Sequence, residues 1–171
     1  MQSRQTLPGR QTAAYRILEF VALSGEFPTD RLSRLPGGEA YKAHVIQSLK
    51  QKHLLRTFYK DGLRGYRLTA KAKGLLTADR PERFLPYLAG AAETNHIKSE
   101  PARRQRLHRI AETAATMQNA GAAIFPDEKP EVFSPAWDGR PQIFITAPAF
   151  YNSREIKELG IEAVKIKGAR S

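Results

Sequence analysis

The sequence predicts a mainly α-helical fold with one β-hairpin, followed by further helices and a small α/β segment at the C-terminal end. Apolar residues recur at helical spacing in several segments. In the first half, two runs rich in aromatic and branched residues flank Asp61-Gly62, a strong short-range signal for a hairpin turn. These two patterns define the predicted fold class.

Positive charge is concentrated in the same half of the chain. The net charge is +11, and residues 1–78 hold 14 Lys and Arg against 5 Asp and Glu, whereas residues 122–171 hold 7 basic and 7 acidic residues. Such an asymmetry indicates a surface for a polyanion in the N-terminal half. A merely solvated, solubilising surface is the alternative explanation.

Composition excludes several classes of protein. The chain has no Cys, so disulfides, thiolate metal sites and a Cys nucleophile are excluded. The four histidines show no metal-ligand spacing, and we expect no cofactor; they are His44, His53, His96 and His108. No apolar run approaches the roughly 18 residues of a membrane span, and the first residues lack the apolar stretch of a signal peptide. We expect a soluble, cytoplasmic protein without a membrane partner.

Two helices are expected before residue 39. Thr12 is a suitable N-cap for the first, and Ser24-Gly25 ends it. Its apolar residues at helical spacing are Ala14, Ile17, Leu18, Val21 and Ala22. A short second helix begins at Pro28 or Thr29 and ends at Pro36-Gly37-Gly38.

A third helix, from Glu39 to about His53, is expected to be amphipathic. Its apolar stripe consists of Tyr41, Val45 and Leu49. The opposite face carries small, amide and basic residues, namely Ala40, Ala43, His44, Gln47, Lys50 and Gln51. It carries no acid, and Glu39 lies at its edge.

The hairpin follows directly. A two-residue turn at Asp61-Gly62 pairs Lys60 with Leu63, Thr57 with Tyr66, Arg56 with Arg67 and Leu55 with Leu68. Leu55, Thr57, Tyr66 and Leu68 then share one face, and Arg56, Lys60 and Arg67 the other. Opposed like charges destabilise an isolated ribbon, so this arrangement favours a neighbouring polyanion. A longer loop would change the partners but still project Lys60 and Arg64. After the hairpin, Thr69 caps a helix over residues 70–78.

This order of elements resembles a winged helix-turn-helix domain. The stretch SLKQKHLLRTFYKDGLRGYRLTAKAKGLL is similar to the pattern in which a recognition helix enters a β-hairpin wing, as in MarR-like and PadR-like bacterial regulators. The resemblance covers residues 12–78. It implies that the third helix enters a DNA major groove while the wing contacts phosphates or the adjacent minor groove.

The resemblance also implies the DNA-binding residues. In the recognition helix, Gln47 and Gln51 would pair with adenine, and Lys50 or His44 would reach guanine or phosphate. The expected recognition residues are Ala43, His44, Gln47, Lys50 and Gln51. The expected wing residues are Arg56, Lys60, Arg64 and Arg67. For each of them a solvated surface side chain is the alternative.

Residues 79–121 are expected to form a helical linker or dimerisation segment. After a short apolar helix in ADRPERFLPYLAGA, a longer one runs from Glu100 to Ala120, with its apolar stripe on Leu107, Ile110, Ala114 and Met117. This stripe packs back on the winged domain or pairs with its copy in a homodimer through residues 99–120. A basic cluster, namely Arg103, Arg104, Arg106 and Arg109, touches DNA or is solvated, and we expect solvation.

Residues 122–171 change in character. A Pro-rich connection precedes a strand in QIFITA, a helix that begins with the capping box Asn152-x-x-Glu155 and ends at Gly160, and a strand in VKIKGARS. This small α/β segment docks on the helices or is the start of a longer domain. The stretch ITAPAFYNSREIKELG resembles replication-relaxation proteins of plasmids and conjugative elements, in which a winged helix precedes an α/β domain.

We therefore expect sequence-specific binding of double-stranded DNA, as a transcriptional regulator or as a replication or mobilisation accessory protein of a mobile element. We expect this DNA binding to need no enzyme activity and no cofactor. Two alternatives stay open. One is a protein-interaction module built on the winged helix. The other is a metal-dependent nuclease, because Asp138, Glu155 and Lys157 resemble the PD-(D/E)xK set, although Glu155 also fits a capping residue.

Overall fold

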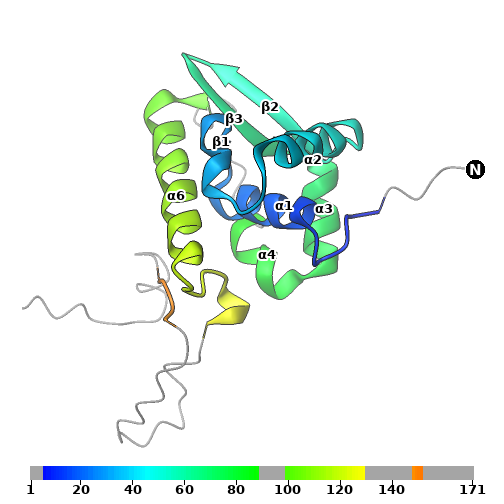
Figure 1. Cartoon of the computed structure of the whole chain (residues 1–171), viewed down its shortest axis with the longest axis vertical. Helices are drawn as coiled ribbons and strands as arrows, with labels where there is room; N and C mark the ends of the chain where they lie inside the picture. Colours follow the sequence, from blue (N-terminus) through cyan, green and yellow to red (C-terminus); the bar gives the residue numbers. More distant parts are fainter. Residues whose placement is uncertain (1–5, 89–98, 130–147, 152–171) are drawn as a thin grey trace, which may run out of the picture.

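A computed structural model describes residues 6–88, 99–129 and 148–151. Its elements in chain order are helix α1 (Ala13–Ser24), strand β1 (Phe27–Pro28), the 3₁₀ helix η1 (Thr29–Arg34), α2 (Glu39–Gln51), β2 (Leu55–Lys60), β3 (Leu63–Leu68), α3 (Ala70–Asp79), α4 (Pro81–Leu88), α6 (Pro101–Asn119) and the 3₁₀ helix η2 (Pro126–Glu128). The fold is mainly helical with one small sheet (Figure 1). This confirms the prediction of helices with a β-hairpin.

The predicted helix ends are found where local chemistry placed them. The Thr12 hydroxyl accepts a hydrogen bond from the Tyr15 N–H at 3.2 Å, and Gly25 ends α1 with φ of 78°. The Thr69 hydroxyl caps α3 in the same way through the Ala72 N–H at 3.1 Å. The predicted short second helix is the 3₁₀ helix η1.

The sheet is antiparallel with strand order β1-β3-β2. All four predicted pairs of the hairpin are present, because Asp61 and Gly62 form a two-residue turn with φ of 52° and 75°. Phe27 and Pro28, for which no strand was predicted, pair with Tyr66 and Gly65. This short third strand joins the hairpin to the end of α1.

One hydrophobic core surrounds α1. Helices α4 and α6 both pack against α1, and their buried residues Phe84, Ala111, Ala114 and Ala115 belong to the same core as those of α1. The predicted stripe of α6 is wrong in part: Ala114 is buried, but Ile110 is exposed. Alanines and the buried Arg104 line its inner face instead. Helix α6 thus packs back on the preceding helices, whereas a homodimer through residues 99–120 stays a prediction.

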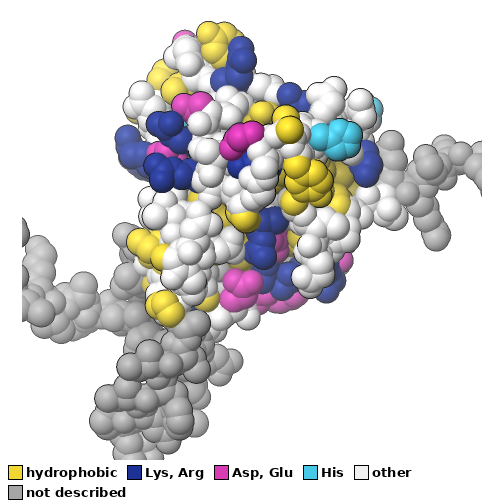
Figure 2. Space-filling view, viewed as in Figure 1, with side chains coloured by type: hydrophobic (Ala, Val, Ile, Leu, Met, Phe, Trp, Pro, Cys, Tyr) yellow, Lys and Arg dark blue, Asp and Glu magenta, His cyan; other side chains and the backbone are white. Residues whose placement is uncertain are grey.

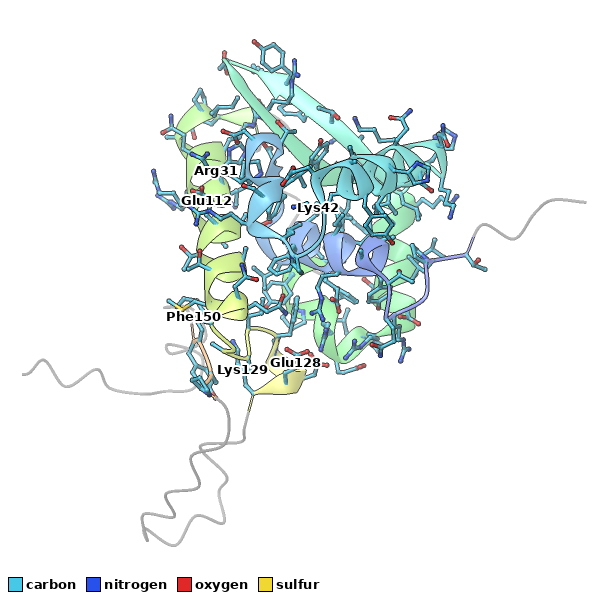
Figure 3. All side chains as sticks on the ribbon, in the orientation of Figure 1. Arg31, Lys42, Glu112, Glu128, Lys129 and Phe150 are labelled. Carbon is cyan, nitrogen blue, oxygen red and sulfur yellow. The ribbon has the colours of Figure 1, made fainter. Side chains whose placement is uncertain are left out.

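The orientation of α2 differs from the prediction at its first turn. Tyr41, expected in the apolar stripe, is 56% exposed, whereas Lys42 is 1% exposed. The Lys42 ammonium donates to the carbonyls of Leu32 at 2.7 Å and Leu35 at 3.0 Å, and it pairs with Glu39 (Figure 3). These carbonyls lie at the end of η1, and that of Leu32 also accepts from the Leu35 N–H at 3.0 Å. Lys42 therefore fixes α2 against η1 and turns Tyr41 outward.

Two short stretches of the C-terminal segment are described. Ala123 forms a parallel bridge with Ala149 through hydrogen bonds to Pro148 and from Phe150. The strands expected in QIFITA and VKIKGARS, the capping box at Asn152 and the triplet Asp138, Glu155 and Lys157 lie outside the described residues. Within the described ranges, no helix combines the length and apolar character that a bilayer span requires.

Candidate nucleic-acid interface

The outer face of α2 presents the predicted recognition residues to solvent. Ala43, His44, Gln47 and Gln51 are exposed, and Lys50 is half-buried. The Lys50 ammonium lies 5.4 Å from the ring centroid of Tyr66, which belongs to β3. The single acid of α2, Glu39, pairs with Lys42. This face therefore combines small, amide and basic groups with an acid only at its N-terminal end.

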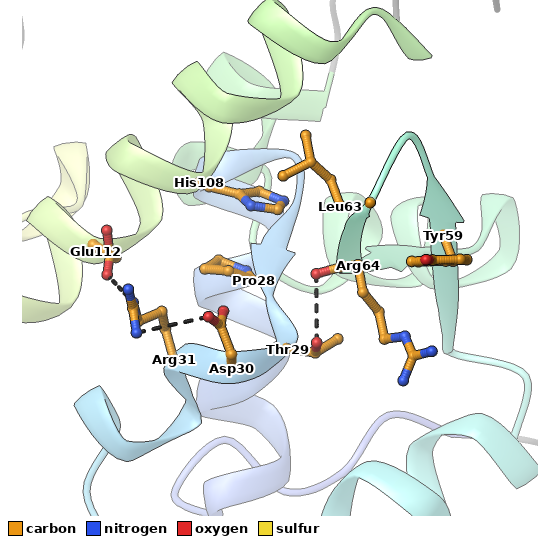
Figure 4. Close-up of a pocket in the computed structure, with 10 residues that line it drawn as sticks. Pro28, Thr29, Asp30, Arg31, Tyr59, Leu63, Arg64, His108 and Glu112 are labelled. Atoms are coloured by element: carbon orange, nitrogen blue, oxygen red, sulfur yellow. Dashed lines mark hydrogen bonds and ion pairs between the residues drawn. The ribbon is translucent and has the colours of Figure 1, made fainter.

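One face of the hairpin adjoins α2. Because Tyr66 meets Lys50, the side chains that alternate with Tyr66 along the two strands lie on the α2 side. Near the turn this face carries Tyr59, which is 64% exposed, and Arg64, its cross-strand partner. The Arg64 guanidinium carbon lies 5.1 Å from the Tyr59 ring centroid (Figure 4). Of the predicted wing residues, Arg64 is thus the one on the hairpin face that adjoins α2.

The other face of the hairpin holds the remaining predicted wing residues. Arg56 and Lys60 are exposed there. Arg67 is not: its Nε donates to the buried Glu26 at 2.6 Å, and its guanidinium lies 4.0 Å from the Phe58 ring centroid. The expectation that Arg67 is presented outward like Arg56 is wrong, because a carboxylate distant in sequence draws it inward.

Glu26 is the centre of a buried ionic group that we call the hairpin cluster: Glu26, Arg67, Arg104 and His108. The side chains of Glu26 and Arg104 are both 0% exposed. Arg104 contacts the carboxylate through Nη2 at 2.7 Å, and His108 Nε2 lies 2.6 Å from it. Burial disfavours the charged carboxyl, but the hydrogen bonds from His108, Arg104 and Arg67 outweigh it and lower the pKa of Glu26 to about 2.

The Arg104 guanidinium also binds the main chain of the hairpin. It donates to the carbonyls of Lys60 at 2.7 Å, Leu63 at 3.0 Å and Phe58 at 3.2 Å. Lys60 and Leu63 flank the turn directly. The expectation that Arg104 is solvated like its three arginine neighbours is therefore wrong. Gly65 could have indicated this packing, because a glycine inside a strand often marks a place where another part of the chain lies close to the backbone.

Gly65 leaves the space that Glu26 occupies. A Cβ atom on Gly65 would lie 2.6 Å from the Glu26 carboxyl carbon, closer than real Cβ atoms come. Any side chain at this position would push the carboxylate away from Arg104.

Basic side chains gather at the tip of the hairpin and on the neighbouring part of α6 (Figure 2). Between them lies an open, polar pocket of about 440 Å³ formed by η1, the hairpin and α6 (Figure 4). Its acids and bases offset each other, since Arg31 pairs with both Asp30 and Glu112. The pocket therefore has no strong preference for either sign of ligand charge.

Among the described residues, no group of three or more His, Asp or Glu side chains is placed to hold a metal ion. Comparison with protein-family models, with curated proteins and with solved structures finds no match to this chain.

Proposed function

We propose that this protein binds double-stranded DNA as a winged helix protein, with α2 as the recognition helix and β2-β3 as the wing. The observation that carries the proposal is the outer face of α2, exposed and free of acid beyond its first residue, beside a hairpin face that presents Tyr59 and Arg64. The order of helices and hairpin supports it, because it matches what the resemblance implies. Its role is that of a transcriptional regulator or of a replication or mobilisation accessory protein.

In this proposal α2 contacts the bases and the hairpin contacts the DNA backbone. The width of a major groove admits α2, whose Gln47 and Gln51 pair with adenine edges while His44 and Lys50 reach guanine or phosphate. Arg64 contacts the backbone or the adjacent minor groove, and the exposed Arg56 and Lys60 add phosphate contacts. Arg67 makes no DNA contact because Glu26 engages it.

The exposed aromatic rings Tyr41 and Tyr59 favour one alternative, in which the same surface binds a protein. The salt dependence of the affinity distinguishes DNA binding from protein binding. A phosphate-binding surface loses affinity linearly in log salt with a slope of about 0.9 per phosphate contact, whereas a protein interface of tyrosines and amides does not.

The test is selection of bound duplexes from a random pool, followed by a salt titration of the selected duplex. We expect a defined site, and we expect Arg64→Ala to reduce the salt slope by about one. Arg109→Ala is the matched control, since it removes one exposed positive charge from α6 and should leave the slope unchanged. Absence of affinity for any duplex at low salt contradicts the proposal, and Gln47→Ala with unchanged sequence preference contradicts the assignment of α2.

A further inference from the structure

We propose that Arg104 of α6 is a positioning residue for the wing, so that α6 belongs to the DNA-binding unit although it reads no base. The inference rests on the proposed function and extends it beyond α2 and the hairpin. It is carried by the hydrogen bonds between a fully buried guanidinium, both strands of the hairpin and the Glu26 carboxylate.

A two-stranded hairpin has little stability or fixed direction of its own. Here, β1 supports it through only two residues, Phe27 and Pro28, which pair with Tyr66 and Gly65. The part of the hairpin beyond Gly65, which carries Tyr59 and Arg64, has no ladder partner in β1. Arg104 acts at this end, where the Thr29 hydroxyl also donates to the Arg64 carbonyl at 3.4 Å. It binds the carbonyls of Lys60 on β2 and Leu63 on β3.

The Glu26 carboxylate fixes the guanidinium itself. It accepts from Nε of Arg104 at 3.1 Å and from Nη2 at 2.7 Å, which leaves the fork oriented toward the hairpin carbonyls. Glu26 follows Gly25, the residue that ends α1, and α6 packs on α1. The hairpin is therefore tied to the rigid helical core rather than to its own turn.

Only an arginine satisfies this arrangement. Its planar fork serves three carbonyls and one carboxylate at once, whereas a lysine ammonium offers three donors around a single atom. Because Arg104 is inaccessible to solvent, it has no means of contacting phosphate in this fold. Its contribution to DNA binding is thus indirect: it holds Arg64 and Tyr59 at a set angle to α2, which Lys42 fixes to η1.

The hydrogen bonds from Arg104 to the hairpin are expected to raise the affinity for DNA. If the hairpin end is held before DNA arrives, binding requires no further ordering of it, and preorganisation of this kind raises affinity. Loss of Arg104 then weakens binding without removing a phosphate contact. The salt slope stays the same while the dissociation constant rises, a combination that loss of a surface arginine does not produce.

The experiment compares Arg104→Lys with Arg106→Lys in the full chain, the latter an exposed arginine on the same helix. Hydrogen exchange is followed in peptides that cover β2 and β3, with α1 as internal reference. We expect Arg104→Lys to accelerate exchange near the turn by about tenfold or more, to weaken duplex binding by about tenfold, and to leave the salt slope unchanged. The Arg106 variant should match the wild type in exchange.

The outcomes separate the inference from the proposed function. Unchanged exchange in the hairpin would show that Arg104 does not hold the hairpin end, whether or not the protein binds DNA. Faster exchange with unchanged duplex affinity overturns the positioning role. Faster exchange in a protein that binds no duplex contradicts the proposed function and, with it, the positioning role in DNA binding. It still confirms that Arg104 holds the hairpin end. Should Arg104→Lys not fold, Arg104→Gln gives the same comparison, since it leaves Glu26 paired with Arg67 and His108. Because this variant also removes the positive charge, a smaller salt slope would make Arg104 a phosphate contact instead.

Discussion

Among the described residues, two ionic groups, each built around a buried side chain, join the helices, and they are built in opposite ways. The hairpin cluster surrounds one carboxylate, Glu26, with Arg67, Arg104 and His108. A second group, the Arg83 cluster, surrounds one guanidinium on α4 with carboxylates: Arg83 pairs with Glu19 of α1 and with Asp127 and Glu128 of η2, and Arg80 joins it.

The difference in composition appears in the titration of the two buried glutamates. The pKa of Glu26 lies at about 2, because three donors outweigh its burial. The pKa of Glu19 is raised, because its burial outweighs the attraction of Arg83, Arg16 and Arg80. Folding therefore favours the charged form of Glu26 and disfavours the charged form of Glu19. The first cluster depends on its central charge, whereas the second tolerates loss of one of several carboxylates.

The largest expected effect is that of Glu26→Gln at neutral pH. Removing the charge leaves Arg104 and Arg67 buried without their counter-ion, and a shift from 4.5 to about 2 corresponds to roughly 3 kcal/mol. We expect the free energy of unfolding to fall by about 3 kcal/mol, measured by urea denaturation. A loss below about 1 kcal/mol would mean that the cluster contributes little.

The Glu26 carboxyl also makes the free energy of unfolding depend on pH. Its pKa is 4.5 in the reference state and about 2 in the fold, so its stabilisation is complete above pH 4.5 and disappears as the pH falls toward 2. We expect the gap in unfolding free energy between wild type and Glu26→Gln to narrow over this window. A gap that is independent of pH between 6 and 2, in denaturant titrations at each pH, would exclude the charge as its source.

Gly65→Ala tests the packing of the same cluster without changing a charge. The added methyl group would overlap the Glu26 carboxylate, and overpacking of this kind costs about 1–3 kcal/mol. Gly74→Ala is the control: its Cβ meets nothing within 4 Å in the interior of α3, so we expect a gain of up to about 1 kcal/mol. Equal effects of the two substitutions on thermal unfolding would contradict the close approach at Gly65.

Local signals in the sequence were sufficient for the helix ends and for the register of the hairpin. Thr12 and Thr69 cap helices through contacts three residues away, and Asp61-Gly62 sets the pairing of both strands from the turn outward. The outer face of α2 was also predicted, because helical spacing alone separates it from Val45 and Leu49. Such features depend on neighbours in the chain and need no knowledge of the fold.

The predictions that were wrong concern residues whose contacts are distant in the sequence. Glu26 and Arg104 are 78 residues apart, and the local sequence around either residue does not indicate that the other is its partner. Hydropathy also ranks Tyr41 as core and Lys42 as surface, yet the end of η1 offers carbonyls that an ammonium can satisfy and a phenol ring cannot. Burial of a charge is decided by partners that arrive through tertiary structure, so a periodic pattern assigns such residues to the surface.

The smallest effect is expected from Glu19→Gln, and it carries the comparison of the two clusters. Because the folded pKa of Glu19 is raised, its carboxyl stabilises the fold more when protonated than when charged, and this difference is lost as the pH rises through the folded pKa. We expect Glu19→Gln to change the unfolding free energy by less than about 1 kcal/mol at pH 7, since Asp127 and Glu128 still neutralise Arg83. Relative to the wild type, this variant should gain stability with rising pH, whereas Glu26→Gln should lose it. Parallel pH profiles of the two variants in denaturant titrations would show that the clusters do not differ in the sense inferred here.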